Sequence, residues 1–463
     1  MTVTRLPELF GLLSLVLAVS AIICDTTYCK PPACICPSLN PPGGILPTDA
    51  PQFVTLTFDD AIQPASYQVA LELLSPRNHN GCQAKGTWFA TVQYCNPALA
   101  QRWYSAGNEV AGHTFNHIGI PSEAEIVSGK LALVKYGGIP RGKLSGFRTP
   151  FLNYTKDTLS ILQKDSFQYD SSATALKDDA YWPYTLDNGL ANDCWKGICN
   201  EPVKLPGLWE IPMHSILDDV GTPHLMDPYL DGNATVVEAW IRNNFDRHYS
   251  GGRAPFGLYI HPVHLVNNNA SMAMLKSAIA YMASHPDVYF VTNQQLLKYM
   301  ANPVSKAVLD SQDYMQCLVP SIPTEICNGR DDTGVLGAKI DQGLLETCSF
   351  ATAAWATCYG CPATEPTAEN PTPAPRSVEG SPGFRYAAPD DCDPLYWSPT
   401  ENKCYCTAET CKYIELSPAL KMPVVVSHGS HGSDAAALVR PFMDVKTTLT
   451  ILGLVSTVFA FVC

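Results

Sequence analysis

The chain has 463 residues, 46% of them hydrophobic, and a formal net charge of −13. This length is enough for one large domain with appendages, at roughly 150 residues per domain. The negative charge and the lack of a basic run that could follow a phosphate backbone argue against a nucleic-acid partner, whereas a neutral or cationic polymer is compatible with both.

The N-terminal segment is typical of a secretory signal. Arg5 precedes an apolar run over residues 9–23 that closes on small residues, as in a cleavable signal peptide. A permanent membrane anchor is the alternative, but the run is short for a span of ~20 residues. We therefore expect residues 1–21 to be removed and the mature protein to be secreted.

Strand-like and helix-like segments alternate over residues 49–300. The first, Phe53–Phe58, is β-branched and aromatic and ends in acidic residues, which predicts a buried strand. Strands alternating with helices imply crossover connections and a parallel sheet. Further strands are expected at 86–90, 109–111, 167–169, 208–212, 256–260 and 288–291, and helices at 67–74, 97–106 and 292–300.

Outside this region the composition changes. A Cys-containing lead-in covers residues 22–48, and Cys-rich segments cover 301–361 and 391–415. Between these two segments, the Pro-, Thr- and Glu-rich residues 362–390 are expected to be an extended linker. We therefore expect an α/β domain with disulfide-rich extensions at both ends.

The C-terminal segment is typical of a lipid-anchor signal. Small residues at 433–436 are followed by a spacer with Arg440 and Lys446 and then by an apolar run over 447–463. This layout predicts a glycosylphosphatidylinositol (GPI) signal over residues 434–463, and a single transmembrane helix is the alternative. We expect the mature protein at the cell surface, held to the plasma membrane by lipid or associated with a wall.

The chain has 18 cysteines, which predict disulfides in a protein that enters the secretory route. Cys194 and Cys199 are expected to close one short loop. If the signal peptide and Cys463 are both removed, an odd number of cysteines remains, so one thiol is free or intermolecular, or cleavage falls after Cys24. Other cysteines cluster at Cys29, Cys34 and Cys36, and at Cys404, Cys406 and Cys411.

Two groups of residues could carry chemistry. Asp59 and Asp60 end the first expected strand, where adjacent side chains project to different sides and can have different roles. His113 and His117 are four residues apart, so a single helical turn would point both in the same direction. Two histidines and one carboxylate suit Zn²⁺ or another divalent transition metal. Each group alone is more often structural, as a strand-end turn or a packed histidine pair.

Five motifs together resemble a known family. They are Thr57-Phe58-Asp59-Asp60, His113-Thr-Phe-Asn-His117, Arg148-Thr-Pro-Phe151, Trp209-Glu-Ile-Pro212 and Leu258-Tyr-Ile-His261. Their order and rough spacing resemble the polysaccharide deacetylase family (NodB homology domain, carbohydrate esterase family 4), and the chain looks most like its insect and fungal chitin deacetylases. The resemblance implies a catalytic domain over residues 49–300 with an α/β fold, a distorted (β/α) barrel of the NodB homology type.

The resemblance also implies the principal catalytic roles. Asp60, His113 and His117 would hold the metal, with Zn²⁺ the usual occupant in this family and Co²⁺ compatible with the same ligands. Asp59 would be the general base for water, and His261 the acid that protonates the departing amine.

Further roles follow from the same resemblance. Arg148 would hold the base carboxylate by a bidentate pair, and the backbone N–H of Phe151 would complete an oxyanion hole, at a position where the family usually has Tyr. Trp209 would form an apolar wall against the acetyl methyl group, or simply belong to the core. An acidic residue is expected to tune His261. The candidates for that residue are Glu210, Asp218 and Asp219, while His214, His224 and His264 have no assigned role.

The expected function is hydrolysis of N-acetyl groups on chitin or chitooligosaccharides, giving chitosan and acetate. Alternatives are a deacetylase of another acetylated glycan such as acetylxylan, a non-catalytic surface protein that binds chitin, and an iron oxygenase with the same ligand geometry. The complete ligand set favours an enzyme, and Asp59 with His261 favours hydrolysis.

The expected partners are chitin or another N-acetylglucosamine polymer and, through the lipid anchor, the membrane. The sequon at Asn153 is expected to be poorly glycosylated, because a glycan there would crowd the cleft.

Overall fold

A computed structural model of the protein describes residues 24–200, 203–320, 326–329, 344–389, 391–406 and 413–415. The expected signal peptide and anchor signal lie outside these residues. None of the helices in the described part of the chain is both long and apolar enough to span a membrane.

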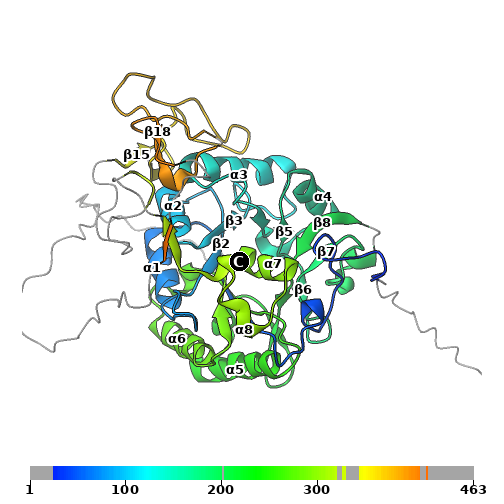
Figure 1. Ribbon diagram of the computed structural model, residues 1–463. Coiled ribbons are helices and arrows are strands. Elements are labelled where there is room, and N and C mark those ends of the chain that lie inside the picture. The colour runs from blue at the N-terminus through cyan, green and yellow to red at the C-terminus, as the bar shows by residue number, and fades with distance from the viewer. Residues whose placement is uncertain are drawn as a thin grey trace, which may run out of the picture. The chain divides into compact units, whose positions relative to one another are not determined.

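Nine of the described strands form one central sheet (Figure 1). In sheet order they are β12 (Phe256–Ile260), β1 (Gln52–Asp59), β2 (Gly86–Ala90), β3 (Glu109–Gly112), β4 (Gly146–Phe147), β5 (Tyr169–Asp170), β8 (Leu205–Glu210) and β7 (Tyr184–Leu186), while β13 (Val288–Phe290) also pairs with β1. Neighbours in this sheet are parallel except β7 and β8. The parallel sheet predicted from the sequence is confirmed.

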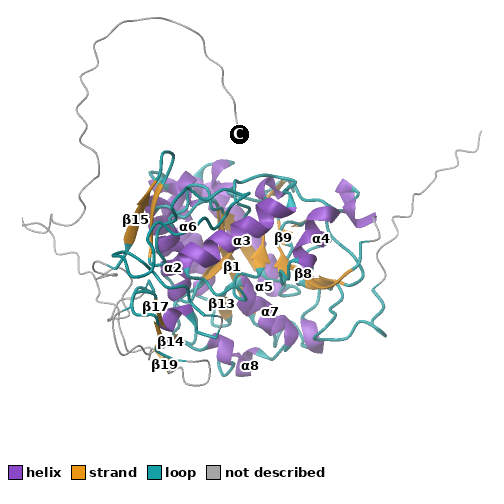
Figure 2. Cartoon of the chain, turned by 90° about the horizontal axis from the view of Figure 1, so that it is seen from above, coloured by secondary structure: helices purple, strands orange, loops and turns teal. Residues whose placement is uncertain are grey.

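Helices connect these strands and cover the outside of the sheet, as Figures 1 and 2 show. They are α1 (Pro64–Leu73), α2 (Pro97–Ser105), α3 (Glu123–Gly137), α4 (Lys156–Lys164), α5 (Ala234–Ser250), α6 (Asn269–Ala283), α7 (Asn293–Ala301) and α8 (Lys306–Leu309). The three expected helices correspond to α1, α2 and α7, and Thr292 caps α7 by accepting a hydrogen bond from the Gln295 amide. Helices α3 to α6 and the short helix α8 were not predicted.

The sheet curls so that its far side approaches β12, the first strand in sheet order. Two short strands, β6 (Thr174–Ala175) and β9 (Met213–His214), continue the pairing of β5 with β8. The His214 amide donates a hydrogen bond to the Tyr259 hydroxyl at 2.8 Å, which joins β9 to β12. The fold is therefore a curled α/β sheet of the expected class, and the main-chain ladder of the described strands does not close into a complete barrel.

Side chains alternate between two hydrophobic clusters along the sheet. On β2, Trp88 packs with Phe58 and Trp103 beneath the surrounding helices, whereas Phe89 points into the curl. The inner cluster includes Tyr169, and both clusters are almost fully buried. This alternation is expected for strands covered on both faces.

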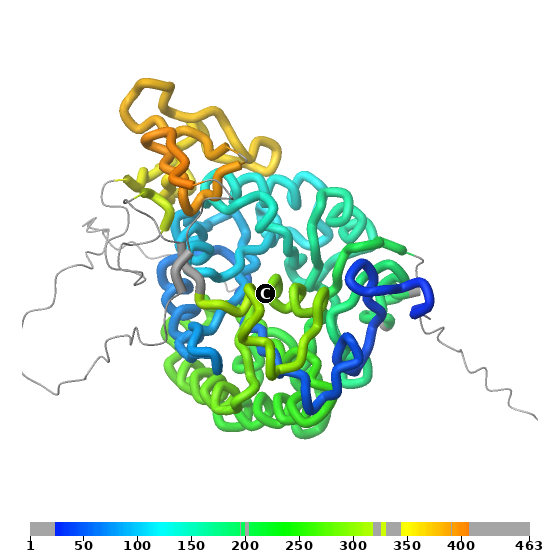
Figure 3. The backbone as a smooth tube through the Cα atoms, viewed as in Figure 1, coloured from blue at the N-terminus to red at the C-terminus, as the bar shows by residue number. Residues whose placement is uncertain are grey.

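The N-terminal lead-in follows the edge of the sheet near β7, where Figure 3 shows the two segments side by side. The Thr185 amide donates to the Ile35 carbonyl at 3.0 Å, and the Trp182 amide donates to the Ser38 carbonyl at 2.9 Å. The lead-in therefore packs on the catalytic domain.

Disulfides occur in both extensions. They join Cys24 with Cys36, Cys29 with Cys34, Cys82 with Cys317, Cys327 with Cys358, Cys348 with Cys361 and Cys392 with Cys404. Cys194 and Cys199 close the short loop predicted for them. Cys95 is buried and free, and Cys24 is bonded, so the odd thiol in the described part of the chain is Cys95.

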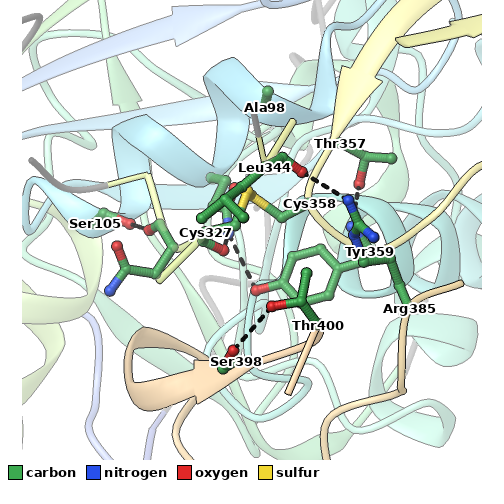
Figure 4. Close-up of a disulfide and its surroundings, with 12 residues drawn as sticks. Ala98, Ser105, Cys327, Leu344, Thr357, Cys358, Tyr359, Arg385, Ser398 and Thr400 are labelled. Atoms are coloured by element: carbon green, nitrogen blue, oxygen red, sulfur yellow. Dashed lines mark hydrogen bonds between the residues drawn. A yellow bond between two sulfur atoms is a disulfide. The ribbon is translucent and has the colours of Figure 1, made fainter. Parts of the chain in front are cut away.

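The Cys-rich C-terminal part docks on α2 around the Cys327–Cys358 disulfide (Figure 4). It also contacts the end of α3, where the Thr357 hydroxyl donates to the Tyr136 carbonyl. Gln101 Nε2 donates to the Cys327 carbonyl and contacts the Tyr359 hydroxyl, each at 3.1 Å. The Tyr359 ring lies over Gly138, which ends α3 with a φ of 59°. A Cβ at this glycine would lie 2.0 Å from the Tyr359 hydroxyl oxygen, so only glycine permits this contact.

The Pro-rich stretch differs from the extended linker expected over residues 362–390. Pro362 and Pro375 form a β-bridge, so the chain folds back on itself. Ala368, between them, is 4% exposed and packs with Phe115 and Tyr136. Composition alone did not reveal this loop, because its contacts are supplied by α3 and by the loop that follows β3.

Candidate functional site

The predicted site residues gather at one edge of the sheet. Asp59 ends β1 and Asp60 follows it, His113 follows β3, Arg148 follows β4, and His261 follows β12. These strands are parallel and close together in the sheet, so their carboxyl ends meet at the same edge. The structure therefore brings together residues that are up to 202 positions apart in the chain.

Asp60, His113 and His117 form a compact set of possible metal ligands. The Nε2 atoms of His113 and His117 lie 3.7 Å and 3.0 Å from Asp60 Oδ1. Donor atoms of all three residues lie within 4.8 Å of one another. Two imidazoles and one carboxylate are a ligand set that Zn²⁺ and related divalent ions accept, with positions left for water and substrate.

The orientation of these side chains fits a metal. His113 Nδ1 donates to the Arg148 carbonyl at 2.7 Å, and because a carbonyl can only accept, Nε2 is left with its lone pair toward Asp60. Asp60 Oδ1 is buried, and despite the short distance to His117 it accepts no well-aligned hydrogen bond from the described residues. A buried carboxylate oxygen that accepts no hydrogen bond is expected of a metal ligand in the absence of its ion.

The protonation states also suit metal binding. Burial lowers the pKa of His113 to about 4, so its imidazole is neutral at pH 7. Burial acts to raise the pKa of Asp60, but His113, His117 and His261 outweigh it and lower the pKa to about 2. A neutral imidazole and an ionised carboxylate are the forms that coordinate metals.

The two histidines do not lie on a helical turn, so that prediction is wrong. Residues 113–120 form a loop, in which Thr114 and His117 have positive φ values of 64° and 57°. Glu125 of α3 holds the loop, because its carboxylate accepts hydrogen bonds from the Asn116 amide at 2.9 Å and the Asn116 side chain at 2.7 Å. Sequence reasoning did not single out Glu125, because it lies outside the motif, on a helix that was not predicted.

Asp59 forms a buried ion pair with Arg148. Arg148 Nη1 lies 2.7 Å from Asp59 Oδ1, and the side chains are 0% and 2% exposed. The pair uses only this one carboxylate oxygen, so the bidentate contact that was predicted is wrong. Arg148 is fixed by further bonds to the Thr57 hydroxyl at 2.9 Å and to the Ser171 carbonyl at 2.9 Å. Asp59 Oδ2 therefore remains open toward the metal ligands, 4.0 Å from His113 Nε2.

His261 is paired with Asp227, which the sequence did not reveal. His261 Nδ1 lies 2.6 Å from Asp227 Oδ2, and the His261 amide donates to Asp227 Oδ1 at 2.7 Å. Burial would lower the pKa of His261, but Asp227, together with the charges of Asp59 and Asp60, raises it to about 9. His261 is therefore a cation at neutral pH, with Nε2 free to donate.

The three residues proposed to tune His261 are elsewhere, so those candidates are wrong. Glu210 is fully buried beside Asp170, Asp218 faces His224 at 3.5 Å, and Asp219 is exposed. Asp227 follows no strand or helix, which is why no pattern marked it. It reaches His261 because Met226 forms a bridge with Tyr259 of β12.

Comparisons with known proteins address the family. Residues 47–169 match the family described as Polysaccharide deacetylase. Over 323 residues the chain is 32% identical to Chitin deacetylase 8 of Bombyx mori, a match that covers 65% of this chain and 83% of that protein. The chain belongs to the polysaccharide deacetylase family. A second relative of this deacetylase, Chitin deacetylase 1 of Bombyx mori, is 31% identical over 308 residues, which cover 60% of this chain and 57% of that protein.

Solved structures of similar proteins match the deacetylase at lower identity. The family 4 carbohydrate esterase from Streptomyces lividans is 16% identical with a TM-score of 0.30, covering 51% of this chain and 91% of that one. A peptidoglycan deacetylase from Bacillus subtilis is 17% identical with a TM-score of 0.30, covering 55% of this chain and 93% of that one.

Family membership makes the protein a hydrolase that acts on acetyl amides. Its disulfides are typical of an extracellular protein.

Two predicted substrate-binding residues of the deacetylase lie in different surroundings. Phe151 is 71% exposed, and its ring meets the His117 ring edge-on with the centroids 4.6 Å apart. It therefore lies at the rim of the site. Trp209 is 7% exposed and packs in the inner cluster with Tyr169, whose hydroxyl bonds to Glu109 at the opposite end of β3 from His113. The surroundings of Trp209 are those of a core residue, and its position does not support a role as an apolar wall against the acetyl methyl group.

Proposed function

We propose that this protein hydrolyses N-acetyl groups of chitin or chitooligosaccharides, releasing acetate and leaving chitosan. The observation that carries the proposal is the convergence of a buried base, a metal-ligand set and a paired imidazolium at one sheet edge. Asp59 is the base, Asp60 is one of the metal ligands, and His261 is the imidazolium. Hydrolysis of an amide needs all three functions. The choice of polymer is supported by the two relatives, which are chitin deacetylases by name.

Asp60, His113 and His117 would hold the metal, and their nitrogen and oxygen donors favour Zn²⁺, with Co²⁺ as the second candidate. A divalent ion bound there would polarise the acetyl carbonyl and lower the pKa of water. Arg148 contributes through its carbonyl, which fixes the His113 tautomer.

Asp59 acts as the general base. Its Oδ1 accepts a hydrogen bond from Arg148, which holds the carboxylate in place, while Oδ2 takes the proton of the attacking water. The water oxygen forms a bond to the carbonyl carbon. The Phe151 amide donates to the oxyanion that develops, since the preceding Pro150 has no N–H to offer.

His261 acts as the general acid. Asp227 holds Nδ1, so Nε2 delivers a proton to the glucosamine nitrogen as the carbon–nitrogen bond breaks. The products are acetate and a free amine. Asp227 keeps the imidazole protonated until this step, which is the reason for its buried contact with His261.

Acetate release from a panel of polymers tests the proposal. Chitin oligomers, acetylxylan and peptidoglycan are each incubated with chelated enzyme and with enzyme given Zn²⁺. We expect Zn²⁺-dependent release that is fastest from chitin oligomers. Faster release from acetylxylan would mean that the enzyme uses the same chemistry on this alternative substrate. No release from any polymer would favour the alternative that the protein binds chitin without catalysis.

We also propose export and lipid anchoring. The disulfides of both extensions support an oxidising compartment. The N- and C-terminal signals that the sequence predicts would direct the chain to the outer surface, where wall or matrix polymers are accessible. Release of the protein from intact cells by a phosphatidylinositol-specific phospholipase is the expected result. Retention after that treatment would contradict the anchor.

A further inference from the structure

A second histidine shares the carboxylate that holds the acid. His261 precedes the 3-10 helix η6 (Pro262–Leu265), and His264 lies within it. Side chains three residues apart nearly eclipse one another in this conformation. His264 Nδ1 consequently lies 3.2 Å from Asp227 Oδ2, the oxygen that His261 Nδ1 contacts at 2.6 Å.

Asp227 is held rigidly for this double contact. Its Oδ1 accepts hydrogen bonds from the His261 amide and from the Tyr229 hydroxyl. Only Oδ2 faces the two imidazoles, and the Asp227 side chain is 7% exposed. The geometry is therefore a fixed carboxylate oxygen with two ring nitrogens beside it.

We propose that Asp227, His261 and His264 form a second site for a divalent transition metal, and that metal in excess inhibits the enzyme there. One donor atom from each residue lies within 4.8 Å of the others. The donor set, two imidazole nitrogens and one carboxylate oxygen, is the same as that of Asp60, His113 and His117. It therefore suits the same ions.

The second site is open to solvent but binds the metal more weakly than the first. His264 is 45% exposed, so an ion reaches it directly from solvent. Binding requires the loss of the proton that His261 Nδ1 shares with Asp227, and this competition reduces the affinity. The site consequently fills at metal concentrations above those that fill the Asp60 site.

Occupancy of the second site removes the acid. An ion on His261 Nδ1 replaces both the proton and the Asp227 contact, so the ring no longer becomes the imidazolium that protonates the amine. This inhibition rests on the proposed function, whereas the binding of the ion does not. Zn²⁺ is therefore expected to activate at low concentration and inhibit at high concentration.

The test combines metal stoichiometry with activity. Equilibrium dialysis against increasing Zn²⁺ is performed on the wild type, on His264→Gln and on the control His79→Gln, whose exposed histidine lies in the loop before β2. We expect two ions per chain at saturation in the wild type and in His79→Gln, and one in His264→Gln. Acetate release should rise and then fall with Zn²⁺ in the first two proteins, but rise without falling in His264→Gln.

The outcomes separate the two proposals. One ion per wild-type chain, or a falling limb unchanged in His264→Gln, would overturn the second site. Two ions per chain without acetate release at any Zn²⁺ concentration would overturn the proposed function and leave the second site standing. Full activity of His264→Gln at low Zn²⁺ shows that the variant is folded. If His264→Gln lacks that activity, a folded His264→Asn variant is dialysed instead. One bound ion per chain in that variant supports the second site, and two bound ions overturn it.

Discussion

Arg148 Nη1 donates a hydrogen bond to Asp59 Oδ1 at 2.7 Å, with both side chains closed off from solvent. Arg148 comes from the end of β4 and Asp59 from the end of β1, so the pair connects strands that are separated by two others in the sheet. A buried charge pair of this kind stabilises a protein only while both partners are present. Here it also fixes the carboxylate that is proposed to accept the proton of water.

Replacing Arg148 by Met should leave Asp59 buried and unpaired. We expect the free energy of unfolding to fall by about 3–5 kcal/mol, the cost typical of removing one partner of a buried pair. The deacetylase activity should fall by about 100-fold or more, because a misplaced base loses most of its effect. Urea unfolding and acetate release measure the two quantities.

The double variant Arg148→Met with Asp59→Asn is the control. It removes both charges, so part of the lost stability should return while the activity stays low. If the double variant is no more stable than Arg148→Met alone, the buried charge is not the source of the instability.

Asp227→Asn should move the alkaline limit of activity. Asp227, together with the charges of Asp59 and Asp60, raises the pKa of His261 to about 9. A general acid works only while it is protonated, so wild-type activity should decline as the pH rises through about 9. Without the carboxylate the pKa falls, and the decline should begin at a pH lower by about one to three units. The pH dependence of kcat/KM measures the shift.

Asp218→Asn is the matched control, since Asp218 faces His224 rather than His261. It should leave the alkaline limit unchanged. An equal shift in both variants would mean that general loss of negative charge, not the contact with His261, sets the limit.

Much of the site was predictable because its residues directly follow strands. Asp59, Asp60 and His261 end segments that the sequence marks as strands, and the resemblance to the family grouped them into one site. Asp227 could not be found in this way, since it lies in a loop and reaches His261 only through the tertiary pairing of Met226 with Tyr259. Sequence spacing also misled at His113 and His117, because positive φ values replace the helical turn.

The fold was predicted less completely around the helices. The buried face of α3 includes Ser128, Gly129 and Lys130, so this helix lacks the apolar stripe that marks helices in a sequence. Gly129 is explained only by tertiary contact, as a Cβ there would lie 3.0 Å from the Thr114 carbonyl carbon. The Pro-rich loop around Ala368 depends on the same helix, because the Ser128 hydroxyl donates to the Ala368 carbonyl.

Cys95 should be unreactive in the native protein. It is 3% exposed and burial raises its pKa to about 12, so it has almost no thiolate at neutral pH. Iodoacetamide should modify Cys95 only after unfolding, which peptide mass spectrometry detects. Modification of Cys95 in the folded protein would contradict its burial.

The sequon at Asn153 should be poorly occupied. Its carbonyl accepts the Ile120 amide at 2.7 Å, and the residue lies two positions after Phe151 at the rim of the site. Both asparagines are exposed, but a glycan at Asn153 would crowd the substrate cleft, whereas Asn269 lies at the start of α6. Intact-glycopeptide mass spectrometry should show lower occupancy at Asn153 than at Asn269, and full occupancy at Asn153 would refute this.

The central claim is metal-assisted hydrolysis at Asp60, His113 and His117, and acetate release from a chitin oligomer by chelated and Zn²⁺-restored enzyme tests it most directly. Chelation should abolish release by the wild type, and Zn²⁺ should restore it. In His117→Ala, Zn²⁺ at the same concentration should restore less than about one-hundredth of that rate, as one of the ligands is missing. His79→Ala should respond like the wild type. Unchanged, chelator-resistant release by His117→Ala would contradict the account.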